Sequence, residues 1–560
     1  MKALKLLVFS LLAAAATARL HAQPDDVVIR AMRDEMKRSA QLHIASTDAP
    51  YYVQYKIVDT RSLEAHGSLG ALVSSGETRT RLLTVSVRVG NYDLDSSNFS
   101  GGNSALAALL GSLSGVANLP VDDNYDELRR RIWLATDTAY KKAVEDYSGK
   151  KATLESKGRG ESIPDFSKEP ARQETATLPP VDVKMADAEH LVRAASAVFL
   201  KLPLVESSDA RLEVTNSTEH FLNSEGTSYI RQLPDVYFHA SATMQNSTGE
   251  MFSDSCSEYG RSRADLPTDA ALVEESQAVV DRLIDRHKGK AAKRYNGPVL
   301  LEGEAAAELF AHHFANLLSS HPSSGGGGNS ALAVLLSGPT ASLLNKVGSR
   351  VLPDFLSVTD NPTLTTFDGH TLRGDYKFDE EGVPSRTTVL IKDGILKTLL
   401  TSRTPARGML VSTGNMREHG VLPGNLFVDA TKTATHDELR KQLADLITAR
   451  GLDYAYIVRR LAGNQAIEAI RVYPDGHQDT VRDARVAEIT ASSFKDILAV
   501  SKEQTVYTER AQTGALVGLG SRADLITYVV PDLLFEDMTI EHIPNETPKL
   551  PDIASPLAAK

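Results

Sequence analysis

The sequence of 560 residues contains one cysteine, Cys256, and one tryptophan. A single cysteine excludes an internal disulfide and any zinc site built from several thiolates. An excess of basic residues is also missing, because 61 Lys+Arg face 72 Asp+Glu and the net charge is −11. Since binding to phosphates requires a basic face, we expect no nucleic acid partner. After the first residues no long apolar run occurs, so we expect no membrane span in the mature chain.

The start of the chain has the layout of a secretory signal peptide. Lys2 and Lys5 precede an apolar run over residues 6–16, and small or polar residues follow before Pro24. This order of charge, apolar run and small residues predicts cleavage, here after Ala22. An uncleaved anchor is the alternative, but the run is shorter than the ~20 apolar residues that span a bilayer. We therefore expect a signal peptide over 1–22 and an exported protein, periplasmic or extracellular.

The length predicts two or more domains, and the periodicity of apolar residues indicates their content. Amphipathic helices are expected over 25–41, 126–147, 186–200 and 269–286, and alternating strands over 51–58, 78–89, 211–214 and 229–232. The charged, proline-rich stretch 150–180 indicates a surface connection. A new apolar block begins after a basic stretch at 287–293. We therefore predict an N-terminal domain over 23–290, a C-terminal domain over 291–545 and a tail over 546–560.

The second half combines a few helices with many strand-like runs. A helix is expected over 303–318, a glycine-rich mobile loop over 319–328, and strands over 387–391, 395–401, 454–459, 466–473 and 525–530. Thr435 and Glu438 form a capping box at the start of another helix, and Gly451 occupies its C-cap position. Helices mixed with largely antiparallel strands predict an α+β protein of two domains.

Three sequence motifs carry a resemblance to a known family. The run from Phe378 to Lys397 contains the turn pairs Glu-Gly and Asp-Gly around an alternating strand, which predicts a β-hairpin. Ser412-Thr-Gly-Asn-Met-Arg and Phe221-Leu-Asn-Ser-Glu-Gly-Thr stand downstream and upstream of it. In wording and order these elements resemble the TldD/PmbA family of metallopeptidases, in which PmbA is also called TldE. The resemblance covers most of residues 200–540 and, more loosely, the N-terminal part.

The resemblance implies a zinc site whose residues are largely replaced in this chain. The catalytic subunits of the family carry a His-Glu-x-x-x-His helix and a cysteine near the C-terminus; the imidazoles and the thiolate hold zinc, and the glutamate takes a proton from the zinc-bound water. Here Glu308 occupies the first ligand position, Leu309 the general-base position and His313 the last ligand position. Residues 511–520 contain no cysteine, and Cys256 belongs to the other domain.

Two interpretations of this helix stay open. In one, Glu308 pairs with His312 at i,i+4, or with His313, and His321, His370 or Asp360 completes a rearranged zinc site. In the other, Glu308 and His312 are an ordinary pair on the helix surface, His313 is a hydrogen-bonded, partly buried histidine, and no cofactor is bound. A phosphate-binding loop and a Gly-x-Ser-x-Gly elbow are both missing from the sequence.

The loss of most of the zinc motif favours a metal-free subunit. The resemblance implies that such a subunit pairs with a family paralogue, or with itself, around an internal cavity that admits unfolded peptide. The alternatives are an active zinc metallopeptidase with a rearranged site and an exported binding module without a role in proteolysis.

Overall fold

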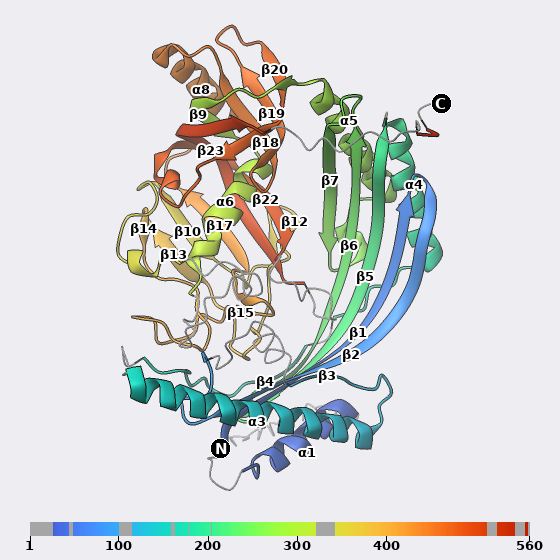
Figure 1. The fold of residues 1–560 in the computed structure, drawn as a ribbon, viewed down its shortest axis with the longest axis vertical. Helices are drawn as coiled ribbons and strands as arrows, with labels where there is room; N and C mark the ends of the chain where they lie inside the picture. The colour runs from blue at the N-terminus through green and yellow to red at the C-terminus, as the bar shows by residue number, and fades with distance from the viewer. Residues whose placement is uncertain are drawn as a thin grey trace, which may run out of the picture.

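The computed structural model describes residues 26–43, 49–99, 115–157, 163–176, 178–202, 204–320, 342–511, 523–543 and 555–557. Two β-sheets dominate this part of the chain (Figure 1). The predicted signal peptide, residues 321–328 of the glycine-rich segment, and the tail apart from 555–557 lie outside the described residues. In the described ranges, no helix is long and apolar enough to cross a bilayer.

The N-terminal sheet has seven strands in the order β3-β2-β1-β5-β6-β4, and β7 also pairs with β6. Its strands are β1 Pro50–Ser68, β2 Ala71–Val89, β3 Val116–Asn118, β4 Gln173–Ala176, β5 Val205–Asn223, β6 Ser228–Gln245 and β7 Met251–Gly260. The hairpin of β1 and β2 turns at Leu69 and Gly70, which both have positive φ, 49° and 83°. Two residues of this conformation match the right-handed twist of the flanking strands.

Helices cover one face of the N-terminal sheet because its strands alternate apolar and polar residues. The helices are α1 Val27–Ser39, α3 Tyr125–Lys157, α4 Met185–Ala197 and α5 Asp269–Lys288. Leu128, Ile132 and Ala139 of α3 recur at helical spacing and pack on β1 and β2. α4 and α5 cover β5 and β6 with a separate apolar cluster. The other face of the sheet carries the intervening polar residues.

The C-terminal sheet has twelve strands, and its main path runs β14-β13-β10-β17-β23-β9-β18-β19-β20-β8. β23, Leu525–His542, lies at its centre and also pairs with β21 and β22. The remaining elements of this half are β8 Lys290–Ala291, β9 Tyr295–Leu301, α6 Glu304–His313, β10 Leu356–Asp360, β11 Thr366–Phe367, β12 His370–Thr371, β13 Thr388–Lys392, β14 Ile395–Leu396, β15 Met416–Arg417, β16 Gly420–Val421, β17 Asn425–Ala430, α8 His436–Arg450, β18 Ala455–Ala462, β19 Gln465–Val472, β20 Gln478–Arg482, β21 Ala484–Ala487 and β22 Ile497–Arg510.

The predicted fold class is confirmed, since most strand pairs are antiparallel and helices are mixed with them. The capping box of α8 and the left-handed conformation of Gly451 are also confirmed. The hairpin predicted around Asp393 forms between β13 and β14. The domain bounds stay a prediction, although the N-terminal sheet uses strands up to Gly260 and the C-terminal sheet uses strands from Lys290 on.

Several predicted elements have the wrong extent. The stretch 150–180 is not only a connection, because α3 continues to Lys157 and β4 pairs with β6. The helix predicted over 303–318 ends at His313, since Phe314 leaves the helical conformation with φ −126°, and a 3-10 turn follows. The strand predicted over 395–401 ends at Leu396. β5 and β6 are much longer than the strands predicted at 211–214 and 229–232.

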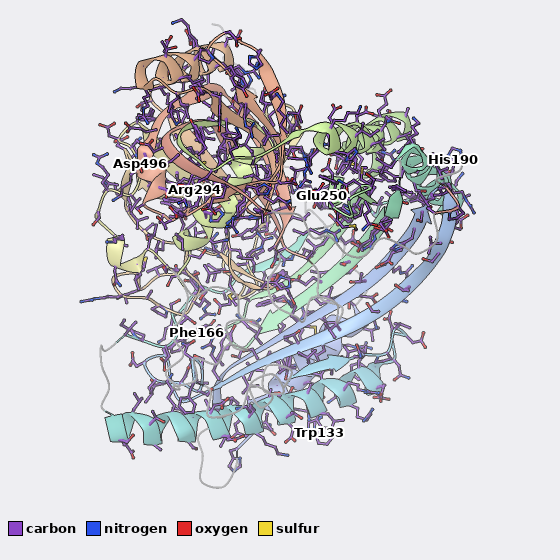
Figure 2. The ribbon with its side chains drawn as sticks, turned by 45° about the horizontal axis from the view of Figure 1, so that its top comes forward. Trp133, Phe166, His190, Glu250, Arg294 and Asp496 are labelled. Carbon is purple, nitrogen blue, oxygen red and sulfur yellow. The ribbon has the colours of Figure 1, made fainter. Side chains whose placement is uncertain are left out.

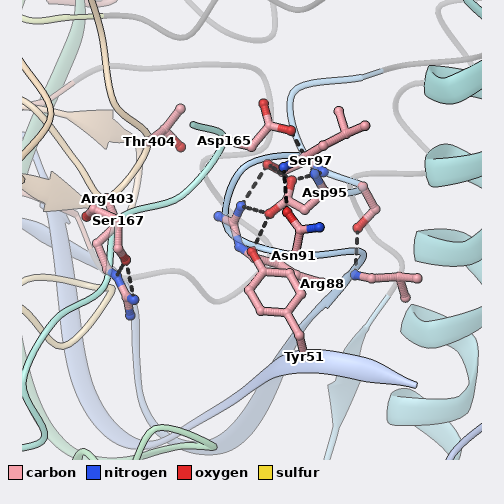
Figure 3. Close-up of polar contacts among 12 residues, drawn as sticks. Tyr51, Arg88, Asn91, Asp95, Ser97, Asp165, Ser167, Arg403 and Thr404 are labelled. Atoms are coloured by element: carbon pink, nitrogen blue, oxygen red, sulfur yellow. Dashed lines mark hydrogen bonds and ion pairs between the residues drawn. The ribbon is translucent and has the colours of Figure 1, made fainter. Parts of the chain in front are cut away.

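The two sheets are joined by buried charged and aromatic side chains. Arg403 of the C-terminal half has a fully buried side chain and forms a bidentate pair with Glu225, with atoms 2.6 and 2.7 Å apart. The ring of Phe166 lies between the two halves (Figure 2), 3.9 Å from the guanidinium of Arg403 and 3.7 Å from that of Arg88. Figure 3 shows Arg403 beside Ser167, and the neighbouring cluster in which Arg88 and Tyr51 bind Asp95.

Candidate functional site

Helix α6 carries the residues that the sequence singles out. It follows β9, and the residue before it is Gly303, whose φ of 59° permits the sharp entry and whose N–H donates to Asp532 Oδ1 at 2.7 Å. Its alanines and Phe310 are buried in the C-terminal core. Leu309, in the position that the family resemblance assigns to the general base, is fully buried in the same core. This position therefore contributes packing and no proton acceptor.

The carboxylate of Glu308 is held by the turn between β18 and β19. Glu308 is 7% exposed, and its Oε1 accepts a hydrogen bond from the backbone N–H of Gly463 at 2.9 Å. Burial raises the pKa of this carboxyl to about 7, because the charged form is poorly solvated there. Glu308 is therefore divided between its acid and its carboxylate near neutral pH.

His312 lies between two carboxylates. Its Nε2 is 3.0 Å from Oε2 of Glu509 on β22, and its Nδ1 is 4.0 Å from Oε1 of Glu308. The hydrogen bond to Glu509 raises the pKa of His312 above its usual range, despite the opposing effect of burial. The two ring nitrogens lie on opposite edges of an imidazole, so the ring separates the two acids instead of joining them at one point.

His313 has a different partner from its neighbour. Its Nε2 lies 2.6 Å from Oδ1 of Asn464, in the same β18–β19 turn that holds Glu308. Partial burial lowers the pKa of His313. Because residues i and i+1 do not share a helix face, the two histidines are bound to different elements. His313 is bound to the turn, and His312 is bound to β22.

The described residues do not assemble the zinc site that the family resemblance implies. Among them, no group of three His, Cys, Asp or Glu side chains is placed to hold a metal ion. The chemistry of the donors agrees, because both nitrogens of His312 face acids on opposite sides and His313 is hydrogen-bonded to an amide. The segment 512–522, where the family resemblance places a cysteine, lies outside the described residues. The donor set of the described residues does not fit a zinc ion.

The other residues proposed for this site lie elsewhere or are not described. Asp360 is fully buried on β10, where it accepts hydrogen bonds from Asn415 at 2.7 Å and from Gly424 N at 2.8 Å, and burial raises its pKa to about 7. His370 is exposed on the short strand β12, and His321 lies outside the described residues. Cys256 is on β7, where burial raises the pKa of its thiol to about 12. None of these residues joins α6 in a described metal-binding group.

The end of β22 connects this site to the polar face of the N-terminal sheet. Arg510, next to Glu509, lies 3.8 Å from the centre of the Tyr237 ring and 3.2 Å from Oε2 of Glu213. Tyr237 stacks on Tyr259 of β7 with ring centres 5.1 Å apart. The face of the N-terminal sheet opposite its helices is therefore turned toward α6 and β22.

Hydroxyl groups line the same face of the N-terminal sheet. Three pairs cross between its strands: Thr60 with Ser217 at 2.8 Å, Thr243 with Ser253 at 2.8 Å, and His239 with Ser257 at 2.9 Å. Small donors and acceptors of this kind bind polar groups without requiring a particular side chain in a ligand. In the structure these groups are paired with one another across the strands.

A buried ionic cluster fixes how the two sheets meet. Lys56 of β1 binds Glu380, with atoms 2.6 Å apart, and also binds Glu418, both from the C-terminal half. Arg231 of β6 lies 2.8 Å from Glu219 and 3.2 Å from Glu380. Each of these charges has an opposite charge close by, which offsets the cost of burial. The cluster joins β1 and β6 of the N-terminal sheet to Glu380 and Glu418 of the C-terminal half.

Sequence reasoning missed the partners of the α6 side chains. Glu509, Gly463 and Asn464 are 150 or more positions away along the chain, and the pairing of β18, β19, β22 and β23 brings them to the helix. The only sequence signal for the turn is the Gly-Asn pair itself, which is typical of a hairpin turn. Nothing in the sequence marks Glu509 as the partner of His312.

The fold is of the α+β class, and comparisons with known proteins show a likeness to metallopeptidases. Residues 293–542 match the family described as the PmbA/TldA metallopeptidase C-terminal domain. A metalloprotease from Archaeoglobus fulgidus is 33% identical over 125 residues, which are 21% of this chain and 28% of that protein. The metalloprotease PmbA of Escherichia coli O157:H7 is 28% identical over 179 residues, or 31% of this chain and 34% of that protein. The alignments with these relatives thus span well under half of the relatives' lengths.

Solved structures share the fold over nearly the whole chain. TldE from Thermococcus kodakarensis has a TM-score of 0.57 at 16% identity, covering 91% of this chain and 100% of that one. A protein described as a putative modulator of a DNA gyrase, from Thermotoga maritima, has a TM-score of 0.58 at 15% identity, with the same coverage. At this identity the neighbours show a shared fold, and the match to the PmbA/TldA metallopeptidase C-terminal domain covers residues 293–542, somewhat less than half of the chain.

Proposed function

We propose that this chain is the metal-free, partner-type subunit of a TldD/PmbA-type peptidase assembly and that it binds unfolded peptide. The observation that carries the proposal is the arrangement of the α6 side chains. His312 is bound to Glu509, His313 to Asn464 and Glu308 to Gly463, while Leu309 fills the core. Leu309 supplies no proton acceptor at the general-base position, and the α6 side chains form no convergent donor set with the other described residues.

The peptide is proposed to lie along the polar face of the N-terminal sheet. Tyr237 and Tyr259 offer a stacked aromatic surface beside Arg510, and the hydroxyl pairs on the same face offer hydrogen bonds. Such contacts suit an extended backbone of any sequence. A folded protein presents few unpaired backbone groups, so this surface favours unfolded peptide. The partner supplies the peptidase activity, and export to the periplasm or the cell exterior is part of the same proposal.

The test combines peptide binding with assembly. A reduced, alkylated and fluorescently labelled polypeptide is titrated with the purified chain, and anisotropy reports binding. Tyr237→Ala and Tyr259→Ala are expected to weaken binding at least fivefold. Trp133→Ala is the control, because Trp133 is 45% exposed on α3, away from this face (Figure 2). Co-expression with a family paralogue is expected to yield a complex; no peptide binding and no complex would overturn the proposal.

An active zinc metallopeptidase with a rearranged site is the second candidate. It is favoured by the i,i+4 placement of Glu308 and His312, whose polar atoms lie 4.0 Å apart, with Glu509 on the far side of the imidazole. A turn of the His312 ring is required before these groups could meet at one ion. Stoichiometric zinc that is lost together with peptidase activity in His312→Ala would favour this candidate.

An exported binding module without a role in proteolysis is favoured if peptide binds and no paralogue associates.

A further inference from the structure

A polar band crosses the helix-covered face of the N-terminal sheet, between two apolar clusters. One cluster is formed with α1 and α3, and the other with α4 and α5. In Figure 1 these two pairs of helices lie at opposite ends of the sheet. Between the clusters the strand register aligns two largely polar rows, one of Arg79, Arg61, Asn216 and Pro234, the other of Arg81, Asp59, Thr218 and Gln232. The apolar cover of this face is therefore interrupted in the middle of the sheet.

A hollow of about 250 Å³ lies over this band. It is lined by residues of β1, β2, β5 and β6 and, from a separate segment, by Leu178, Pro179 and Pro180. Asn216 holds that segment to the sheet, because its Oδ1 accepts from Val181 N at 2.7 Å and its Nδ2 donates to Val181 O at 2.9 Å. The two prolines have restricted φ angles, so this wall is stiff. The hollow is thus preformed, as small-molecule sites usually are.

The charged residues that line the hollow leave one positive charge without a partner. Arg79 binds Asp59 through Nε and Nη2, at 3.0 and 2.7 Å, and Arg81 binds the same carboxylate through Nε at 2.9 Å. Arg61 is exposed and forms no hydrogen bond or ion pair with any residue that the structure describes. Since Asp59, Arg61 and Arg79 are the charged residues of the lining, its net charge is positive by one.

Two neutral side chains of the lining have unused hydrogen-bonding groups. Thr218 of β5 stands opposite Gln232 of β6, and both residues are partly buried. Within the described ranges neither side chain forms a hydrogen bond. Opposed residues of antiparallel strands have Cβ atoms about 4.5–5.5 Å apart, so this hydroxyl and this amide can bind one group of a ligand.

We propose that this hollow binds a small organic monocarboxylate that also carries an amide group and an apolar side chain. The carboxylate pairs with the guanidinium of Arg61, which suits it in shape and charge. The amide bonds to Thr218 and Gln232, and the apolar part packs on Leu178 and the neighbouring prolines. A phosphate dianion fits less well, because the carboxylate of Asp59 in the same hollow repels a second negative charge.

The site is separate from the proposed peptide surface. Gln232 and Tyr237 are both on β6, but successive side chains of a strand point to opposite faces, so residues of even and odd number lie on different faces. Even-numbered residues such as Phe238 pack in the cluster under α4 and α5, whereas Tyr237 faces Arg510 of the C-terminal half. The small-molecule site therefore does not depend on the proposed function.

A ligand-observed NMR titration of the full chain tests the ligand chemistry. The probe N-acetyl-L-leucine carries all three groups, and N-acetyl-L-leucinamide lacks only the charge. The acid is expected to bind, and the amide to bind about tenfold more weakly, because the charged partner of the guanidinium is lost. Equal affinity for the two probes, tighter binding of inorganic phosphate, or no binding of the acid would overturn the proposal.

Substitutions test whether the acid binds in this hollow. Arg61→Gln is expected to weaken its binding about tenfold, and Thr218→Val, which keeps the branched shape of the side chain, about threefold. Arg294→Gln is the matched control, because Arg294 is an exposed arginine of the C-terminal half (Figure 2). Circular dichroism checks that each variant is folded. Acid binding that is unchanged in both variants of the hollow, or that is lost in Tyr237→Ala, would place the acid elsewhere and overturn the site. Binding of the labelled polypeptide is expected to be unaffected by Arg61→Gln, so this proposal and the proposed function fail separately.

Discussion

The Nε2 atom of His313 lies 2.6 Å from the amide oxygen of Asn464, in the turn whose neighbouring N–H, that of Gly463, holds Glu308. A turn between two strands thus binds the two α6 residues that occupy ligand positions in the family resemblance. The remaining candidate ligand, His312, is bound to β22 through Glu509. The helix is anchored on two sides by these contacts, which gives its polar residues a structural role in addition to any role in ligand binding.

Glu308 and His312 predict how stability depends on pH. Burial raises the folded-state pKa of Glu308 from 4.5 to about 7, so the unfolded chain releases this proton first and stability falls as pH rises from about 4.5 to 7. His312, whose pKa is also raised, contributes stability that is present below its unfolded pKa and is lost as pH rises through the folded value. Both groups therefore favour the folded state at lower pH.

Glu308→Gln isolates the contribution of the carboxyl. The amide stays neutral, so the melting temperature of the variant relative to the unmodified chain is expected to increase between pH 5 and pH 8. Over this pH range the free energy of unfolding of the variant, relative to that of the unmodified chain, is expected to rise by on the order of 1–3 kcal/mol. Glu304→Gln, on the same helix and paired with Arg460 at 3.3 Å, is the control. A difference between Glu308→Gln and the unmodified chain that does not change with pH would contradict this account.

Replacing Lys56 is expected to lower the free energy of unfolding, because this residue binds two carboxylates where the two halves of the chain meet. Lys56→Met leaves Glu380 and Glu418 without their shared cation in a buried place, where removing one partner costs about 3–5 kcal/mol. Denaturant unfolding measures the loss. Lys441→Met is the matched control, because Lys441 is 77% exposed in its pair with Asp445, and such a pair contributes about 0–1 kcal/mol. Equal effects of the two substitutions would show that the cluster does not hold the sheets together.

Replacing Thr435, the N-cap residue of α8, is expected to lower the free energy of unfolding by a smaller amount. Its Oγ1 accepts from Glu438 N at 3.3 Å, and Glu438 Oε2 accepts from Thr435 N at 2.7 Å. Thr435→Ala is expected to reduce the free energy of unfolding by about 1 kcal/mol, whereas Thr435→Ser keeps the hydroxyl and most of the stability. Chemical denaturation distinguishes the two; identical losses in both variants would rule out the cap as the cause.

Local sequence patterns predicted the elements whose causes are local. The capping box at Thr435, the left-handed Gly451 and the Asp393 hairpin depend on residues within a few positions of one another, and the structure contains all three. Strand lengths were underestimated because β5 alternates polar and apolar residues over its length without a strong apolar run. The end of α6 at His313 was missed because it depends on how Phe314 packs in the core.

The candidate site could be predicted only as a helix with the right residues on it. The sequence places Glu308, His312 and His313 together because they share one helix. It cannot indicate that Glu509 approaches His312, since that contact follows from the pairing of β22 with β23 and from the packing of α6 on both strands. Nor does it indicate that Arg510, one residue further, reaches Tyr237 on the other sheet. These contacts depend on how strands and helices that are far apart in the sequence pair and pack.

The measurement that tests the central claim most directly is the zinc content of the purified full-length chain, determined by inductively coupled plasma mass spectrometry alongside His313→Ala and His312→Ala. The account predicts that all three proteins, after dialysis against a zinc-containing buffer and removal of free metal, retain well under one zinc per chain. One zinc per chain in the unmodified protein, lost in either histidine variant while the fold is preserved, would contradict it.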